Sequence, residues 1–182
     1  MKLPLFLAMA MATLVQASAQ ITFSGTIDLA ASGVEAPVAG TPYEFWVYNW
    51  DQGGSSGVSG GFTLGAGGTY SFTVSGLNEL GTYRVFFRSD FVTGLGKLVE
   101  VDLQPLMTNI AIPTWSPYLG DFEPDNEISI GDFSYLSDFY NTWIGHPQYD
   151  AYYDLNKDGY IDAMDYSIFA SNYGMAGDDN GF

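Results

Sequence analysis

The 182-residue chain contains no cysteine, so disulfide bonds cannot stabilise it. A small exported protein without disulfides must be held together by a packed core or by a bound metal. The absence of cysteine also excludes a lipid anchor attached through that residue. Hydrophobic residues make up 47% of the chain, which is ample for a packed core and argues against disorder.

Basic residues are also scarce, with five lysines and arginines against 21 acidic residues and a formal net charge of −16. A field of this sign repels nucleic acid and anionic lipid head groups, and it attracts metal cations. We therefore expect no nucleic-acid partner, and we look for a cation site among the acidic residues.

Histidine occurs once, at His146, so a catalytic triad would have a single candidate base. This residue falls in the segment 141–149 between two predicted helices, and we interpret it as a solvated loop residue. Paired carboxylates could hydrolyse glycosides, but most acidic residues belong to the tail, and the rest of the chain is small for a catalytic cleft. The sequence predicts a protein that is not an enzyme.

Long apolar runs are absent as well. The run over residues 3–15 follows Lys2 and precedes Ala17 and Ala19, the pattern that a signal peptidase reads. It is shorter than the roughly 20 residues that a membrane-spanning helix needs. We expect residues 1–19 to be a cleaved signal peptide, and the mature protein to be secreted with no membrane span.

Charge divides the rest of the chain into two parts. Thirteen of the 21 acidic residues follow residue 119, and four of the five basic residues precede it. Pro113 and Pro117 lie close to this boundary and disfavour regular structure between them. We place a β domain at residues 20–113, a linker at 114–119 and a second domain at 120–182.

The first part has short apolar or alternating runs separated by Gly, Ser and Asn clusters, which is typical of β-strands. The candidate strands are residues 21–28, 43–50, 61–64, 70–74, 82–88, 98–103 and 108–112. Seven short antiparallel strands suit an immunoglobulin-like or transthyretin-like sandwich, and we expect the immunoglobulin-like class. Residues 77–85 also resemble prealbumin-like modules, in which a leucine precedes a Gly-x-Tyr-x-Val run.

Aromatic side chains alternate along one candidate strand. Trp46, Tyr48 and Trp50 share a face with Glu44, whose charge suggests that this face is wet. An exposed aromatic row could stack on sugar rings. The row could instead pack beneath a loop, the tail or a partner subunit, as aromatic residues of β-sandwiches routinely do. We favour packing and keep glycan binding as a second hypothesis.

The tail repeats itself after 33 residues. The shift superimposes Asp121 on Asp154, Asp125 on Asp158, Ile128 on Ile161, Asp132 on Asp165, Ser134 on Ser167 and Tyr140 on Tyr173. After each acidic cluster, apolar side chains recur three and four residues apart, which predicts two short helices.

The second repeat meets every requirement of a calcium loop. Such a loop of twelve residues needs oxygen ligands at positions 1, 3, 5, 7, 9 and 12, a residue that tolerates positive φ at position 6 and an apolar anchor at position 8. Gly159 stands at the turn, and Ile161 is the anchor. The predicted ligands are Asp154, Asn156, Asp158, the carbonyl of Tyr160, Asp162 and Asp165.

The first repeat departs from this pattern in three places. Asn126 at the turn accepts positive φ less readily than glycine, Glu123 is one methylene longer than usual, and Pro124 stiffens position 4. We expect two calcium ions, the first loop holding its ion less tightly. The predicted ligands here are Asp121, Glu123, Asp125, the carbonyl of Glu127, Ser129 and Asp132.

The tail resembles the type I dockerins, in which each of two calcium loops is followed, not preceded, by a helix. The resemblance rests on GDFEPDNEISIGDFSYLSDFY and YDLNKDGYIDAMDYSIFASNYG, and on aspartate at position 12 of both loops. It implies a small helical EF-hand pair, from residue 120 to about residue 177, that docks onto cohesin modules. In dockerins, loop positions 10 and 11 usually make the contact. Here they are Ile130 and Gly131 in the first repeat and Ala163 and Met164 in the second, instead of the family's common Ser-Thr pair.

Three functions remain open at this point. The protein could be an adaptor that attaches its β domain to a cohesin-like or other extracellular partner. It could be a carbohydrate-binding module with a calcium-stabilised tail, or a structural subunit of an extracellular assembly. We expect the adaptor, because the dockerin resemblance is the most specific signal in the chain.

Overall fold

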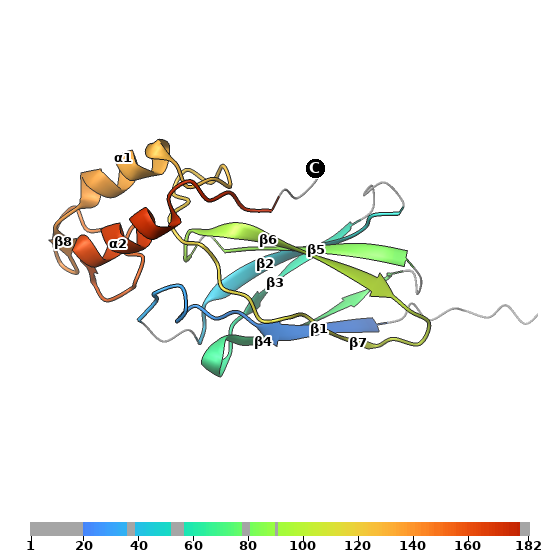
Figure 1. Ribbon diagram of the computed structural model, residues 1–182. Coiled ribbons are helices and arrows are strands. Elements are labelled where there is room, and N and C mark those ends of the chain that lie inside the picture. The colour runs from blue at the N-terminus through green and yellow to red at the C-terminus, as the bar shows by residue number, and fades with distance from the viewer. Residues whose placement is uncertain (1–19, 36–38, 52–56, 78–80, 90, 179–182) are drawn as a thin grey trace, which may run out of the picture.

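The computed structural model describes residues 20–35, 39–51, 57–77, 81–89 and 91–178 (Figure 1). A body of β-sheets carries a small helical region at one end. The expected signal peptide, residues 1–19, lies outside the described residues, as do residues 78–80 of the prealbumin-like stretch. Within the described ranges, no helix combines the length and the apolar character needed to cross a membrane.

Seven strands form two sheets, as the sequence predicts. One sheet has the order β4-β1-β7, with β1 antiparallel to β4 and parallel to β7. The other has the order β3-β2-β5-β6 and is antiparallel throughout. The strands are β1 (Gln20–Thr26), β2 (Pro42–Asn49), β3 (Gly57–Thr63), β4 (Thr69–Ser75), β5 (Gly81–Ser89), β6 (Gly94–Leu103) and β7 (Asn109–Ala111). A short 3-10 turn, Ala66–Gly68, precedes β4.

The strand order differs from that of the seven-stranded constant-type immunoglobulin domain, and β7 pairs in parallel with β1, whereas the sequence predicted antiparallel strands. An immunoglobulin sandwich places its first, second, fifth and fourth strands in one sheet and its third, sixth and seventh in the other. Here β2 and β3 pair within one sheet, while β1 pairs with β4 in the other. Alternation along each strand predicts which side chains face inward, but it does not specify which strand lies alongside.

Aromatic rings fill the space between the sheets. Phe72 of β4 stacks on Phe45 of β2 with ring centroids 3.9 Å apart, and it lies 5.3 Å from Phe23 of β1. Phe87 of β5 packs edge-on against Phe72 and Tyr70. Alternation places these rings inward, because β4 buries every second side chain.

Two capped helices form the helical region. The helices are α1 (Ile130–Phe139) and α2 (Ala163–Asn172), and a two-residue ribbon pairs β8 (Thr142–Trp143) with β9 (Tyr160–Ile161). Ser129 and Asp162 cap the two N-termini, each within a capping box. The helical backbone ends at Tyr140 and Tyr173, which have ψ angles of 142° and 132°, and the next residues, Asn141 and Gly174, adopt positive φ.

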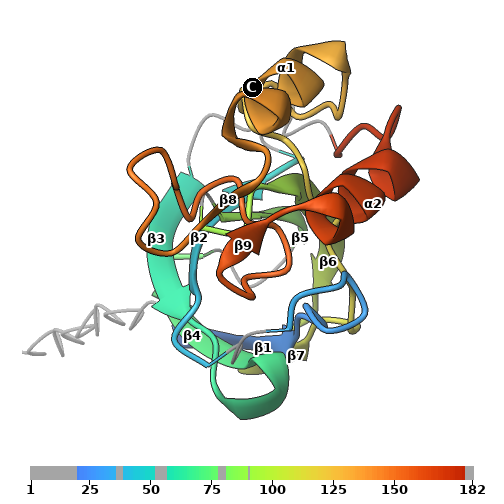
Figure 2. The same cartoon turned by 90° about the vertical axis from the view of Figure 1, so that its left-hand side faces the viewer.

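The body and the helical region share one continuous core. The segment 114–119, expected as a linker, packs onto the body: Trp115 bridges to Ile27, and Leu119 is fully buried. Phe122 and Phe169 of the helical region belong to the same buried cluster as the sandwich rings. Figure 2, which looks onto the helical end, shows the two helices lying across that end of the sandwich.

Candidate functional site

The two acidic loops are related by the same shift of 33 residues that relates their sequences. Tyr160 of the second loop bridges Trp143, which follows α1, and Glu127 of the first loop bridges Ala176, which follows α2. Each loop is therefore tied to the segment that follows the helix of the other repeat. The helical region is a single interlocked unit with an approximate twofold relation.

Position 1 of each loop is a buried aspartate. Asp121 is 2% exposed and Asp154 is 1% exposed. In each, Oδ2 accepts the N–H of the residue at position 6: Asn126 at 3.3 Å and Gly159 at 2.9 Å. In each, Oδ1 is buried and has no hydrogen-bond partner. A buried, unpaired carboxylate oxygen is costly, and a cation at the centre of the loop would satisfy both of these oxygens.

Position 12 of each loop is also a buried aspartate, but its oxygens accept backbone N–H groups. Oδ2 of Asp132 accepts the N–H of Ser129, and Oδ2 of Asp165 accepts that of Asp162. Oδ1 of each accepts the N–H groups at loop positions 2 and 3. The two aspartates thus hold the loop backbone closed and form part of the capping box at the N-terminus of the following helix.

The other predicted ligand side chains orient the loop backbone. Oδ1 of Asp125 accepts the N–H of Glu127, and Oδ1 of Asp158 accepts that of Tyr160. Ser129 and Asp162 accept N–H groups as helix caps, and Asn156 Oδ1 accepts the N–H two residues on. The side chain of Glu123 lies on the surface.

Across the described part of the chain, no three acidic or histidine side chains converge tightly enough to form a ready metal cluster. The fit of a cation rests instead on the two orphaned oxygens of Asp121 and Asp154 and on the oxygen-rich loops around them. Oxygen donors of this kind are those that calcium prefers.

Burial sets the protonation of these loops. It raises the pKa of Asp121 to about 6, an effect that Arg88 opposes and Asp132 reinforces. It also raises the pKa of Asp165, against the hydrogen bonds from backbone N–H groups. Desolvation lowers the pKa of Lys157, while neighbouring carboxylates, Asp154 first, oppose this. A bound cation would stabilise loops of this kind, because it would offset the cost of burying ionised carboxylates.

Asn126 fastens the first loop to the sandwich. Its backbone has φ +69°, so it takes the turn conformation that the sequence analysis required of it. Its Oδ1 accepts the N–H of Gly96 in β6 at 2.7 Å, and its Nδ2 donates to the carbonyl of Asp178 at 2.9 Å. Lys97 pairs with the Asp178 carboxylate at 2.8 Å. Glycine at position 6 could not make these side-chain contacts.

The second loop contacts the sandwich through a different part of its backbone. The N–H of Glu35 donates to the carbonyl of Asn156 at 2.7 Å. The ammonium group of Lys157 lies 5.2 Å from the ring centroid of Phe91. These contacts and those of Asn126 could not be predicted from the sequence, because the partners are far apart in the chain and carry no shared pattern.

The expected docking positions lie on the surface of the helical region. Ile130 is 67% exposed and Met164 is 54% exposed, while Ala163 is exposed and Gly131 is half-buried. Neither Ile130 nor Met164 is part of a core. One turn further along, Phe133 is half-buried and Tyr166 is exposed, so the two repeats present different surfaces.

The aromatic row on β2 is interrupted. Tyr48 is 1% exposed, so the expectation of a wet face is wrong at its centre. Trp46 is half-buried and packs on Phe86, with ring centroids 5.8 Å apart. Trp50 is exposed, but the guanidinium of Arg84 covers one face of its ring at 3.3 Å. Alternation predicted the shared face, but it could not predict coverage by neighbouring side chains.

His146 occupies a loop, as expected. Its ring lies 4.9 Å from that of Trp143, and its Nδ1 accepts the N–H of Gln148. These contacts give the histidine a local structural role in the turn that follows β8.

Comparison with known proteins yields one family and a set of structures. The sequence model of the dockerin type I domain matches residues 119–172. No curated protein matches the chain. Two solved structures that resemble it are interface mutants of a type II cohesin–X–dockerin complex from Acetivibrio cellulolyticus, one altered at the C-terminal and the other at the N-terminal interface.

Both structural similarities extend over nearly the whole molecule. The TM-scores are 0.59 and 0.58 at 21% and 20% identity, and each match covers 86% of this chain and 97% of the other. At this level of identity the likeness establishes the fold. A β body followed by a small helical region is therefore an arrangement that this chain shares with a known structure.

Proposed function

We propose, from the premise that residues 119–172 form a dockerin type I domain, that this protein is a secreted, calcium-binding and non-catalytic adaptor. Its helical region would attach the β body to a cohesin-type module of another protein. The observation that carries the proposal is the match of the dockerin family to two loops whose buried position-1 carboxylates each leave one oxygen unpaired. Export rests on the signal-like residues 1–19 alone.

Two calcium ions are the proposed cofactors. In an EF-hand pair, Asp121 and Asp154 would each provide Oδ1, and the other predicted oxygen donors of the loops would complete the sites. Calcium would supply the positive charge that lets these buried carboxylates ionise together. Because the ligands must be deprotonated and gathered, binding would be coupled to folding of the helical region.

Docking would use the exposed side chains at the starts of the helices. Ile130 and Met164 are large apolar groups held on the surface by capped helix N-termini. Exposed apolar side chains on a rigid element are typical of a protein interface, and methionine adapts to partners of different shape. The structural relatives are themselves complexes of a cohesin with an X–dockerin chain, which supports a cohesin-type partner.

The β body would act as the attached cargo or spacer. The buried Tyr48 and the covered Trp50 leave little of an aromatic sugar-binding row, so we rank glycan binding below adaptor function. A purely structural subunit would not need exposed Ile130 and Met164 side chains.

Binding to purified cohesin modules tests the proposal. The mature chain should bind a type I or a type II cohesin in biolayer interferometry with calcium present, and a chelator should abolish binding. Both types belong in the panel, because the matched family is type I and the structural relatives contain type II cohesins. Failure to bind any cohesin while calcium still binds would refute the docking role and leave the calcium sites standing.

A further inference from the structure

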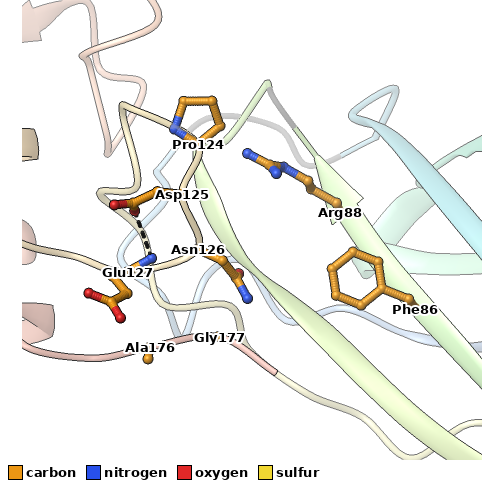
Figure 3. Close-up of a pocket in the computed structure, with 8 residues that line it drawn as sticks. All are labelled: Phe86, Arg88, Pro124, Asp125, Asn126, Glu127, Ala176 and Gly177. Atoms are coloured by element: carbon orange, nitrogen blue, oxygen red, sulfur yellow. Dashed lines mark hydrogen bonds between the residues drawn. The ribbon is translucent and has the colours of Figure 1, made fainter. Parts of the chain in front are cut away.

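An arginine from the sandwich reaches the first calcium loop. Arg88 lies near the end of β5, and its Nη2 is 3.8 Å from Oδ2 of Asp121. Figure 3 shows the side chain rising from the sheet toward Pro124 and Asp125, beside a pocket of about 380 Å³. A positive charge from the body thus stands next to the position-1 carboxylate of this loop.

The second loop has a neutral group in the corresponding place. Oδ2 of Asp154 accepts the hydroxyl of Tyr149 at 2.8 Å. The second loop also contains a basic residue, Lys157, but its ammonium group donates a hydrogen bond to the carbonyl of Ala151 at 2.6 Å. The two loops share a backbone geometry but differ in the charge that faces position 1.

We propose that Arg88 is a built-in counter-ion of the first loop, which holds the loop closed when calcium is absent and lowers its affinity for calcium. The inference rests on the proposed calcium binding and adds a residue outside the dockerin domain that sets the affinity of one site. Calcium would fill the second loop first, and the first loop would fill only at higher calcium concentration.

Charge explains both effects. Without a cation, Asp121 is a buried carboxylate near Asp132 and Asp125, and the guanidinium offsets part of that cost. With calcium in the loop, the same guanidinium repels a divalent ion. The arginine side chain is 25% exposed and borders the open pocket, so it has room to turn toward solvent when the ion arrives.

The backbone of the first loop should stay in place while this exchange occurs. Asn126 holds it to β6 through Gly96, and Gly177 donates its N–H to the carbonyl of Asn126 at 2.8 Å. Replacing Arg88 therefore changes the charge beside the loop and leaves these hydrogen bonds of Asn126 intact. This makes the proposal testable in the full chain.

Calorimetry on matched variants provides the first test. In an Asp158→Ala background, which disables the second loop, Arg88→Gln should tighten calcium binding about tenfold, the effect expected for removing one unit charge beside a divalent ion. Arg84→Gln removes the same charge from the same strand at a position paired with Glu100, and it should leave the affinity unchanged. Unchanged or weaker binding in Arg88→Gln would overturn the proposal.

Thermal unfolding provides the second test and separates an electrostatic role from a structural one. In chelator, Arg88→Gln should unfold at a lower temperature than Arg84→Gln, because the first loop has lost its only nearby guanidinium. In saturating calcium, this difference in unfolding temperature between the two variants should disappear or change sign. A deficit of equal size in both conditions would mark Arg88 as a packing residue and contradict the proposal. If the Asp158→Ala chain binds no calcium at all, the first calcium site itself fails, while the chelator comparison still reports on the pairing of Arg88 with Asp121.

Discussion

The β body and the helical region bury different kinds of side chain. Between its sheets the body buries stacked rings such as Phe45 and Phe72, which need no ligand. The helical region buries Asp121 and Asp154, each with an unpaired oxygen. From this difference we expect two parts of one continuous core to depend on different conditions: the body on apolar contact, the helical region on the proposed calcium ions.

Removing calcium should have the largest effect on this comparison. In a chelator, the ionised carboxylates repel one another with no ion between them, so helical structure should be partly lost, least at α1, where Arg88 stays beside Asp121. Far-ultraviolet circular dichroism would report the helices, and near-ultraviolet signals from the buried rings would report the body. Helix content that does not change on adding the chelator would contradict the metal dependence. Loss of the far- and near-ultraviolet signals together would contradict the separation between the two parts.

Docking should be one-sided, because the two repeats expose different side chains. Ile130→Asp and Met164→Asp, made separately, place a charge at each candidate contact, and only one of them should reduce cohesin binding by tenfold or more. Interferometry with an unchanged calcium stoichiometry would measure this. Leu106→Asp is the matched control, since Leu106 is 90% exposed on the body. Equal, partial losses from both variants would instead indicate two equivalent binding orientations.

Acid should act in opposite directions with and without calcium. Burial raises the pKa of Asp121 to about 6 from an ordinary value of 3.8. A raised carboxyl pKa favours the folded state at low pH, and this stability is lost as the pH rises from about 4 to about 6. The chelated helical region should therefore be more stable at pH 4.5 than at pH 7.

Calcium and protons compete for the same carboxylate, so the calcium-loaded protein should show the reverse trend. At pH 5, about one unit below the pKa of Asp121, the first loop should bind calcium roughly tenfold more weakly than at pH 7. Calorimetry in the Asp158→Ala background isolates this loop. An affinity independent of pH would contradict control of this loop by the raised pKa of Asp121.

Much of this architecture could be predicted from local sequence. Alternation predicted seven strands, and helical spacing predicted α1 and α2. The 33-residue repeat predicted the two loops, including the positive φ of Asn126. The start of β3 was missed by four residues because Gly57, Gly60 and Gly61 weaken its strand signal. Local patterns report the conformation of a segment and the face it buries.

What the sequence could not predict are the pairings over long distance. The sheet order, the burial of Tyr48 and the contact of Arg88 with Asp121 all join residues that lie far apart in the chain. Pro113 and Pro117 predicted a linker at residues 114–119, yet Leu119 packs in the shared core. Such contacts depend on how whole elements meet, and no periodicity of a single segment encodes that.

Calorimetric titration of calcium into the chain from which calcium has been removed tests the central claim most directly. The account predicts two ions per chain, with the tighter step lost in Asp154→Asn and the weaker step lost in Asp121→Asn, because each variant keeps the volume of the side chain and removes its charge. Binding of no ion, or two steps that survive both substitutions, would contradict it.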